Sequence, residues 1–181
     1  MCVCVIRHGS SGLLFAGLSR RTDLLGIAAI VGATLSVAVI GGVAGDFRSD
    51  WYGRLRKPRW QPSGGVIASI WTGLYVSIAV SGGMLWLRRR KAGSALPGLF
   101  AAQWILNAAW TPLFTRARRL DLATLDCAAL AITNAALLVV AWPVSRRATL
   151  LLVPYTAWSA FATFLSWTIY KLNRDEPDVA P

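Results

Sequence analysis

The hydrophobic positions of this 181-residue chain fall into five long runs, separated by short clusters of cations, aromatic residues and prolines. A helix rises about 1.5 Å per residue, so roughly 20 apolar residues cross a hydrocarbon core of about 30 Å. The runs lack the period-two alternation that marks the strands of a membrane barrel. We therefore predict five transmembrane helices, at residues 24–47, 66–87, 96–114, 122–142 and 148–172.

The composition favours an all-α membrane protein over a soluble one. Hydrophobic residues make up 55% of the sequence and charged residues 15%, whereas a soluble domain carries about 25% charged residues. The net charge of +11 does not indicate a nucleic-acid partner. The cations gather between the apolar runs, where their partners are membrane lipids. We expect an integral, multi-pass protein, and the abundance of glycine and alanine favours a bacterial cell membrane.

The predicted fold class is a five-transmembrane-helix bundle that forms one domain, residues 24–174. Residues 1–23 form an N-terminal extension that we expect to be flexible. It resembles a weak signal sequence, but its apolar core is too short and is followed by Arg20 and Arg21 instead of a small-residue cleavage site. Residues 175–181 form a C-terminal tail. The orientation stays open, since nine Lys and Arg residues lie on the N-terminal side and ten on the opposite side.

Conventional catalytic and metal-binding patterns are absent from the sequence. The chain has one histidine and three cysteines, with no CxxC pair and no Cys/His cluster, which argues against a zinc site, a haem attachment or a disulfide framework. We therefore predict no metal and no cofactor, assign no catalytic residue, and leave open whether the protein is an enzyme.

The chain contains nine tryptophans, and their depth in the membrane separates two roles for them. Trp and Tyr favour the two membrane interfaces, and five of the tryptophans fit that position: Trp51, Trp60, Trp86, Trp110 and Trp142. Trp158 lies ten residues into its helix, which places it about 15 Å deep. Its indole N–H needs a partner, either in a packed core or in a cavity.

Polar and aromatic positions converge in the half of the membrane next to the first connector. Trp71, Asn107 and Trp158 all fall at that depth when they are counted from the helix ends. Intramembrane polar groups usually face the bundle interior or a wet cavity, so we predict a pocket there. Ala162 and Ser166 follow Trp158 at intervals of four and share its helix face.

Two more residues bear on this pocket. Tyr75 lies one turn after Trp71, so two helices offer rings that can sandwich a flat, apolar ligand. Asp126 lies at a similar depth, but it is so near the interface that we favour a helix cap or an arginine pair for it.

The first connector, residues 48–65, contains the segment WYGRLRKPRWQPS. Its aromatic and cationic residues have two interpretations. They are belt aromatics and snorkelling cations of the kind found at any membrane interface, or they form the lid of the pocket.

Three motifs resemble the TspO/MBR family of tryptophan-rich sensory proteins and translocator proteins, also known as the peripheral benzodiazepine receptor family. They are the connector followed by IWTGLY, then QWILNAAWTPLF, then PYTAWSAFATFLSWTIYKLN, and the similarity covers about residues 24–174. The resemblance implies a five-helix membrane bundle that forms a homodimer. It also implies a pocket under the first connector for porphyrins such as protoporphyrin IX, and in animals for cholesterol and benzodiazepine-type drugs.

The resemblance and the depth count together give the candidate site. The predicted ligand-binding residues are Trp71, Tyr75, Asn107, Trp110, Trp158, Ala162 and Ser166. The predicted lid residues are Trp51, Arg54, Lys57, Pro58 and Trp60. In the lid, aromatic rings would cover a tetrapyrrole and the cations of residues 54–59 would meet its carboxylates.

The sequence departs from the family pattern at two positions. Ser63 replaces the second proline of the connector motif, which we expect to loosen the junction between the lid and the next helix. Ser166 replaces the asparagine of the last motif, which removes an amide from the pocket and favours flat porphyrins over drug-type ligands.

Three functions compete at this point. The first is a porphyrin-binding sensor or regulator of stress or pigment metabolism. The second is an enzyme that degrades porphyrin with light and oxygen, for which the resemblance implicates Trp71 and Trp158. The third is a transporter of tetrapyrroles or other small hydrophobic molecules, which the absence of internal repeats disfavours. We favour the sensor.

Overall fold

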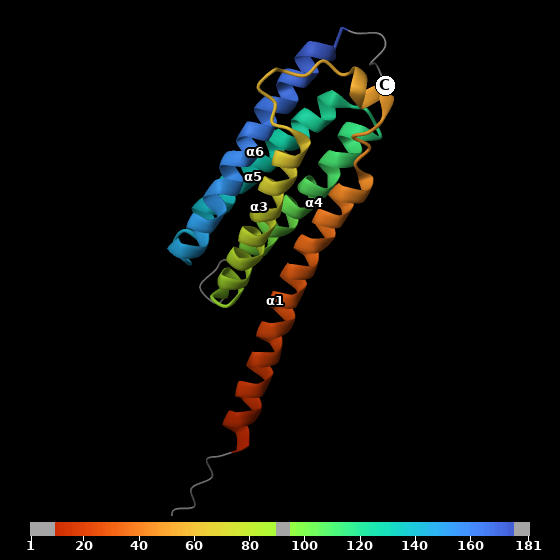
Figure 1. Ribbon diagram of the computed structural model, residues 1–181. Coiled ribbons are helices and arrows are strands. Elements are labelled where there is room, and N and C mark those ends of the chain that lie inside the picture. The colour runs from red at the N-terminus through yellow and green to blue at the C-terminus, as the bar shows by residue number, and fades with distance from the viewer. Residues whose placement is uncertain (1–9, 90–94, 176–181) are drawn as a thin grey trace, which may run out of the picture.

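The computed structural model describes residues 10–89 and 95–175, with side chains from residue 20 onward. Every regular element in these residues is a helix, as predicted. The elements are α1 (Ser10–Ala44), α2 (Asp50–Arg54), α3 (Gly64–Trp86), α4 (Ala95–Thr115), α5 (Leu120–Ala141) and α6 (Arg146–Asn173) (Figure 1). Four of them are long and apolar enough to cross a membrane: α1 from Arg20 onward, α3, α5 and α6.

The largest differences from the predicted helices lie at the start of α1 and in the connector. Helix α1 already begins at Ser10, within the extension that we expected to be flexible, because this stretch contains no proline and is rich in good helix formers. The short helix α2 lies in the connector and was not predicted. Ser49 caps it by accepting a hydrogen bond from the backbone N–H of Tyr52 at 3.4 Å.

Serine caps also start two of the long helices. Ser145 caps α6, and Ser63 caps α3 by accepting a hydrogen bond from the backbone N–H of Val66 at 3.4 Å. We expected Ser63 to loosen this junction, but its hydroxyl satisfies one of the free N–H groups at the start of the helix. The replaced proline could not make that bond.

The five long helices close into a ring. Helix α1 packs against α3 and α4, α3 packs against α6, and α5 joins α6 to α4. The connector with α2 covers the end where α1, α4 and α6 finish (Figure 1). The first turns of α1 project beyond the opposite end of the bundle.

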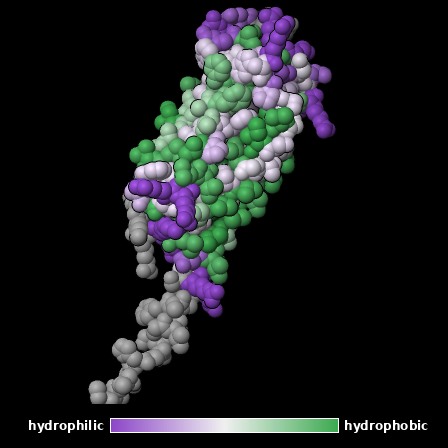
Figure 2. Space-filling model, turned by 60° about the vertical axis from the view of Figure 1, so that its left-hand side comes forward, coloured by the Kyte–Doolittle hydropathy of each residue, from purple (hydrophilic) through white to green (hydrophobic). Residues whose placement is uncertain are grey.

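The outer face of the ring is apolar. A hydrophobic band lies between two hydrophilic ends (Figure 2). Large apolar side chains with more than half of their surface exposed come from all five long helices; they include Leu25, Val43, Val76, Ile105, Leu125, Ile132, Val139, Leu150 and Phe164. Such a surface needs lipid rather than water around it, so the protein is an integral, multi-pass membrane protein.

Helix α1 packs closely on α3 in the half of the bundle away from the connector. A Cβ atom on Gly82 would lie 2.7 Å from Cγ2 of Ile30, and one on Gly26 would meet the ring of Trp86. Glycine is required here because the two helices approach so closely.

Replacing Gly82 with leucine should lower the melting temperature in detergent, because overpacking a contact of this kind costs about 1–3 kcal/mol. Gly73→Leu is the matched control on the same helix, since a Cβ there meets no atom within 4 Å. Equal melting temperatures for the two variants would show that α1 and α3 do not approach so closely.

Candidate functional site

A cavity of about 760 Å³ lies inside the ring, at the connector end. All five long helices and the connector contribute to its wall. The seven residues predicted to bind a ligand all line it: Trp71, Tyr75, Asn107, Trp110, Trp158, Ala162 and Ser166. The cavity therefore lies where the depth of the polar and aromatic residues predicted a pocket.

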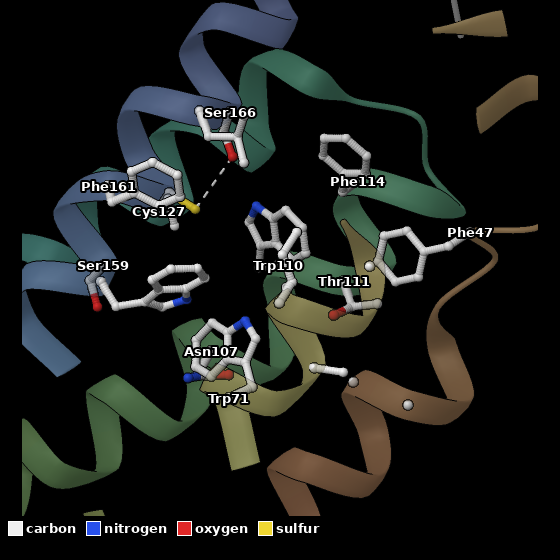
Figure 3. Close-up of a pocket in the computed structure, with 18 of the residues that line it drawn as sticks. Phe47, Trp71, Asn107, Trp110, Thr111, Phe114, Cys127, Ser159, Phe161 and Ser166 are labelled. Carbon is white, nitrogen blue, oxygen red and sulfur yellow. Dashed lines mark hydrogen bonds between the residues drawn. The ribbon is translucent and has the colours of Figure 1, made fainter. Parts of the chain in front are cut away.

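Aromatic rings form three sides of this cavity. On α3, Trp71 stacks on Tyr75 with ring centroids 5.4 Å apart. On α4, Trp110 and Phe114 are 5.0 Å apart and nearly parallel, at 28°. On α6, Trp158 and Phe161 are also 5.0 Å apart. Trp71, Trp110 and Phe161 point into the space between their three helices (Figure 3), which suits a flat ring that can stack on aromatic faces.

A chain of hydrogen bonds forms the floor of the cavity. The Tyr75 hydroxyl donates to Oδ1 of Asn107 at 3.3 Å, and Nδ2 of Asn107 donates to the Tyr155 hydroxyl at 2.9 Å. Tyr155 in turn donates to Oε1 of Gln103 at 2.9 Å. The chain links α3, α4 and α6 across the bundle. It fixes the Asn107 amide, so the floor is held in one arrangement before any ligand arrives.

Gln103 and Tyr155 were not among the predicted site residues. Gln103 lies four residues before Asn107, so the two side chains share one face of α4. That spacing of two amides in an apolar run was the signal that pointed to a buried polar face.

Two indole N–H groups in the cavity wall are without a partner. Nε1 of Trp110 and Nε1 of Trp158 are buried and form no hydrogen bond with any residue in the described part of the chain. A buried donor without an acceptor is costly. A ligand that brings acceptor atoms, such as ring nitrogens or carbonyl oxygens, would satisfy both.

Ser166 bonds to Cys127 on α5. Its hydroxyl lies 3.7 Å from the thiol sulfur, and both residues line the cavity (Figure 3). Thiol sulfur is a weak hydrogen-bond partner, so this contact holds the Ser166 hydroxyl only weakly.

Asp126 does not fill the role that we favoured for it. It is buried on α5, Arg119 occupies the cap position of that helix without a side-chain bond, and Arg119 pairs with Asp121 at 2.7 Å instead. Oδ2 of Asp126 has no hydrogen-bond partner among the described residues. The carboxyl therefore neither caps the helix nor pairs with an arginine there.

The connector covers the cavity, but with other residues than those predicted. Phe47, Arg48, Tyr52 and Gln61 line the cavity, whereas none of the five predicted lid residues does. The sequence correctly placed the connector over the pocket and could not show which of its side chains turn inward.

The five predicted lid residues have other positions. Trp51 is buried in a cluster with Phe114 and Ile169, while Arg54 is exposed at the end of α2. Trp60 stacks on Phe164 of α6, on the outer face, with ring centroids 5.3 Å apart.

The remaining two lid residues stabilise the connector itself. The Lys57 ammonium donates to the carbonyl of Tyr52 and lies 3.9 Å from the centroid of its ring, and partial burial lowers the pKa of Lys57. The carbonyl of Pro58 accepts a hydrogen bond from the backbone N–H of Gln61, which closes a turn.

Asn173, the last residue of α6, fastens the connector to the bundle. The backbone N–H of Arg56 donates to Oδ1 of Asn173 at 2.9 Å, and Nδ2 of Asn173 donates back to the carbonyl of Arg56, also at 2.9 Å. Asn173 is buried. This reciprocal pair holds the connector across the end of the cavity.

We expect Asn173→Ala to release the connector, because the backbone N–H and carbonyl of Arg56 lose the two hydrogen bonds that hold them to α6, each worth about 0.5–1.5 kcal/mol. Limited trypsin digestion in detergent should then cut the connector, which contains four arginines and one lysine, markedly faster than in the unmodified protein. Thr168→Ala on the same helix is the control, since Thr168 bonds only to the carbonyl of Phe164 in its own helix. Unchanged digestion of Asn173→Ala would mean that other contacts hold the connector.

The cavity also reaches the outer surface between α1 and α3. Gly42, Ala68 and Thr72 line it and are themselves exposed. This side of the bundle faces lipid, so an apolar ligand can approach the cavity from within the membrane.

The sequence matches the profile of the TspO/MBR family over residues 29–172. The chain belongs to the TspO/MBR family. The resemblance drawn from the three motifs is thereby confirmed.

Relatives of this TspO/MBR protein come from bacteria and animals. It is 39% identical to the tryptophan-rich protein TspO of Bacillus cereus over 123 residues, which cover 68% of this chain and 80% of the relative. It is 38% identical to the translocator protein of Sus scrofa over 127 residues, or 68% and 75% of the two chains. It is 31% identical to the tryptophan-rich sensory protein of Cereibacter sphaeroides over 129 residues, or 71% and 80%.

Proposed function

We propose that this protein binds porphyrins, or flat tetrapyrroles like protoporphyrin IX, in the cavity under the connector. The observation that carries the proposal is the set of aromatic faces on α3, α4 and α6 around one space. The volume of about 760 Å³ lies in the usual range for small-molecule pockets, about 300–1,000 Å³. A flat apolar ring can stack there, while the two free indole N–H groups can meet its acceptor atoms.

The role that we propose for this binding is sensory or regulatory. Relatives carry the names tryptophan-rich sensory protein and translocator protein, and the first of these supports a sensor. The described residues contain no group of three or more metal-ligating side chains, and the cavity is instead lined by aromatic and small residues.

The test is a titration of the purified protein with protoporphyrin IX in detergent, in the dark, followed by porphyrin absorbance and tryptophan fluorescence. We expect saturable binding that the double variant Trp71→Phe/Trp158→Phe weakens, because phenylalanine keeps a ring but loses area and the indole N–H. Non-saturating signals that are the same for both proteins would mean partition into micelles and would refute the proposal.

We also propose that α4 crosses the membrane as the fifth span. Its 21 residues carry no charge, and Gln103, Asn107 and Thr111, which lower its hydropathy, are all buried inside the bundle. Its neighbours in the ring, α1 and α5, are both candidate spans. Cysteines placed next to each end of α4 should react with a membrane-impermeant thiol reagent from opposite sides of sealed vesicles.

A second candidate function is light-dependent degradation of the bound porphyrin by oxygen. The supporting observation is the group of electron-rich rings beside the cavity, where Trp71 lies 5.4 Å from Tyr75 and 6.1 Å from Tyr155 between ring centroids. Such rings can donate electrons to an excited ligand. A new absorbing product that forms only under illumination, and only with Trp71 and Trp158 intact, would favour the enzyme over the sensor.

The homodimer implied by the family also remains a proposal. Small residues recur every four positions on α1 (Gly41 and Gly45) and on α3 (Gly73, Ser77 and Ser81), and such ridges can pack within one bundle or between two. The structure uses members of both ridges within one chain. Gly41 lines the cavity, and the Ser81 hydroxyl donates to the carbonyl of Ala148 on α6 at 2.8 Å. A dimer would therefore use the exposed apolar band, and light scattering in detergent would detect it.

A further inference from the structure

We propose that Arg48 recognises the carboxylates of the ligand and makes the cavity selective for flat rings that bear acid groups. This inference rests on the proposed porphyrin-binding function and adds to it the residue that chooses among ligands. It replaces the prediction that cations of residues 54–59 meet the acid groups, because none of those side chains lines the cavity.

Arg48 occupies a distinctive position at the mouth of the cavity. It follows the C-terminal end of α1 in the connector and is the single charged side chain among the described residues that line the cavity. Phe47, Tyr52 and Gln61 line the same end of it. The cation therefore stands at the boundary between the apolar interior and the polar end of the protein.

The charge of Arg48 is not neutralised by a neighbouring acid. Its guanidinium forms no hydrogen bond and no ion pair with any residue in the described ranges 10–89 and 95–175, where the nearest acids in sequence are Asp46 and Asp50. Lys57 and Arg116, by contrast, are engaged with backbone carbonyls.

The chemistry of the cavity fixes which end of the ligand lies at Arg48. A carboxylate moved into the apolar interior would lose its hydration, and the neutral N–H groups of Trp110 and Trp158 offer too little in return. At the mouth, the acid group keeps water and gains a charge-assisted, bidentate contact with the guanidinium. The ring then points inward, between the aromatic faces.

A different source of negative charge exists, since Arg48 lies at a membrane interface and lipid phosphates can bind it there. If Arg48 binds only lipid phosphate, it gives the cavity no preference between a porphyrin acid and its ester. The comparison of an acid with its ester separates the two roles, because the ester keeps the flat ring and loses only the charge.

The experiment measures the affinity of protoporphyrin IX and of its dimethyl ester for three proteins in the same detergent, with empty micelles subtracted. The proteins are the unmodified chain, Arg48→Gln, and the control Arg54→Gln, whose side chain is exposed and outside the cavity. We expect the unmodified protein to prefer the free acid by about tenfold. Arg48→Gln should remove that preference by weakening the acid alone, and Arg54→Gln should keep it.

The outcomes against the proposal are distinct. Equal affinity of the unmodified protein for acid and ester would overturn the role of Arg48 and leave porphyrin binding intact. A parallel loss of both ligands in Arg48→Gln would mean that Arg48 only holds the connector, and it would also overturn the proposal. No saturable binding of either ligand to the unmodified protein would refute the proposed function itself.

Discussion

Ala162→Trp should lower the affinity for protoporphyrin IX by about a hundredfold, which corresponds to roughly 2.8 kcal/mol. Ala162 lines the cavity one turn after Trp158 and one turn before Ser166. An indole at this position projects into the space between the aromatic faces, where the ring of the ligand would lie. The ligand cannot push the new side chain aside, because packed interiors yield little. Equilibrium titration in detergent measures the change.

The matched control is Ala160→Trp, two residues earlier on the same helix. Ala160 is exposed on the lipid-facing side and does not line the cavity. It should bind porphyrin like the unmodified protein. If both variants bind normally, the porphyrin lies outside the cavity; if both lose binding, the extra indole harms α6 itself and the comparison does not support a site there.

Tyr155→Phe should cause the largest loss of stability, about 2–4 kcal/mol, because it leaves two buried partners unpaired. Tyr155 is 1% exposed and bonds to both Asn107 and Gln103. Without its hydroxyl, Nδ2 of Asn107 and Oε1 of Gln103 lose their partner inside the bundle. A melting temperature in detergent that falls by several degrees would show this.

Tyr170→Phe is the control for the same chemical change, since the hydroxyl of Tyr170 forms no hydrogen bond with the described residues and lies near the end of α6. The variant should melt like the unmodified protein. Equal melting temperatures for Tyr155→Phe and the unmodified protein would contradict the hydrogen-bonded floor. Restored stability in the quadruple variant Tyr75→Phe/Asn107→Leu/Gln103→Leu/Tyr155→Phe would support it, because every member of the hydrogen-bond chain is then apolar.

The sequence correctly predicted an all-helical membrane protein, because hydrophobic length decides this class; four of the five predicted spans meet the length and hydropathy of a membrane helix. Apolar runs of about 20 residues in lipid can only be helices, so the five long helices appear close to their predicted bounds. The start of α1 was predicted too late, since the arginines at 20 and 21 end an apolar run without ending a helix. Charged residues show where the chain leaves the hydrocarbon core. A helix ends only where the backbone is interrupted, for example by proline or by residues of low helix propensity.

The interior of the pocket was also accessible from the sequence. Helix period and depth place Trp71, Asn107 and Trp158 at one level, and the structure brings them to one cavity. The connector residues that face the cavity were harder to predict, because the path of the connector depends on residues far away in the sequence. Trp51 is drawn into a cluster with Phe114, and Asn173 fixes Arg56 from a position 117 residues away. No local pattern reports such contacts, so Arg48 was not distinguished from the other cations.

The central claim is that a porphyrin occupies the cavity under the connector, and photoaffinity labelling tests it most directly. A protoporphyrin derivative with a diazirine on one side chain would be bound in the dark, activated once, and its attachment points mapped by mass spectrometry of the digested protein. We predict labels on cavity residues of α3, α4 and α6, competed away by unlabelled protoporphyrin IX and absent in Ala162→Trp. Labels confined to exposed apolar residues such as Ile132 and Val139, unaffected by competitor, would contradict the account.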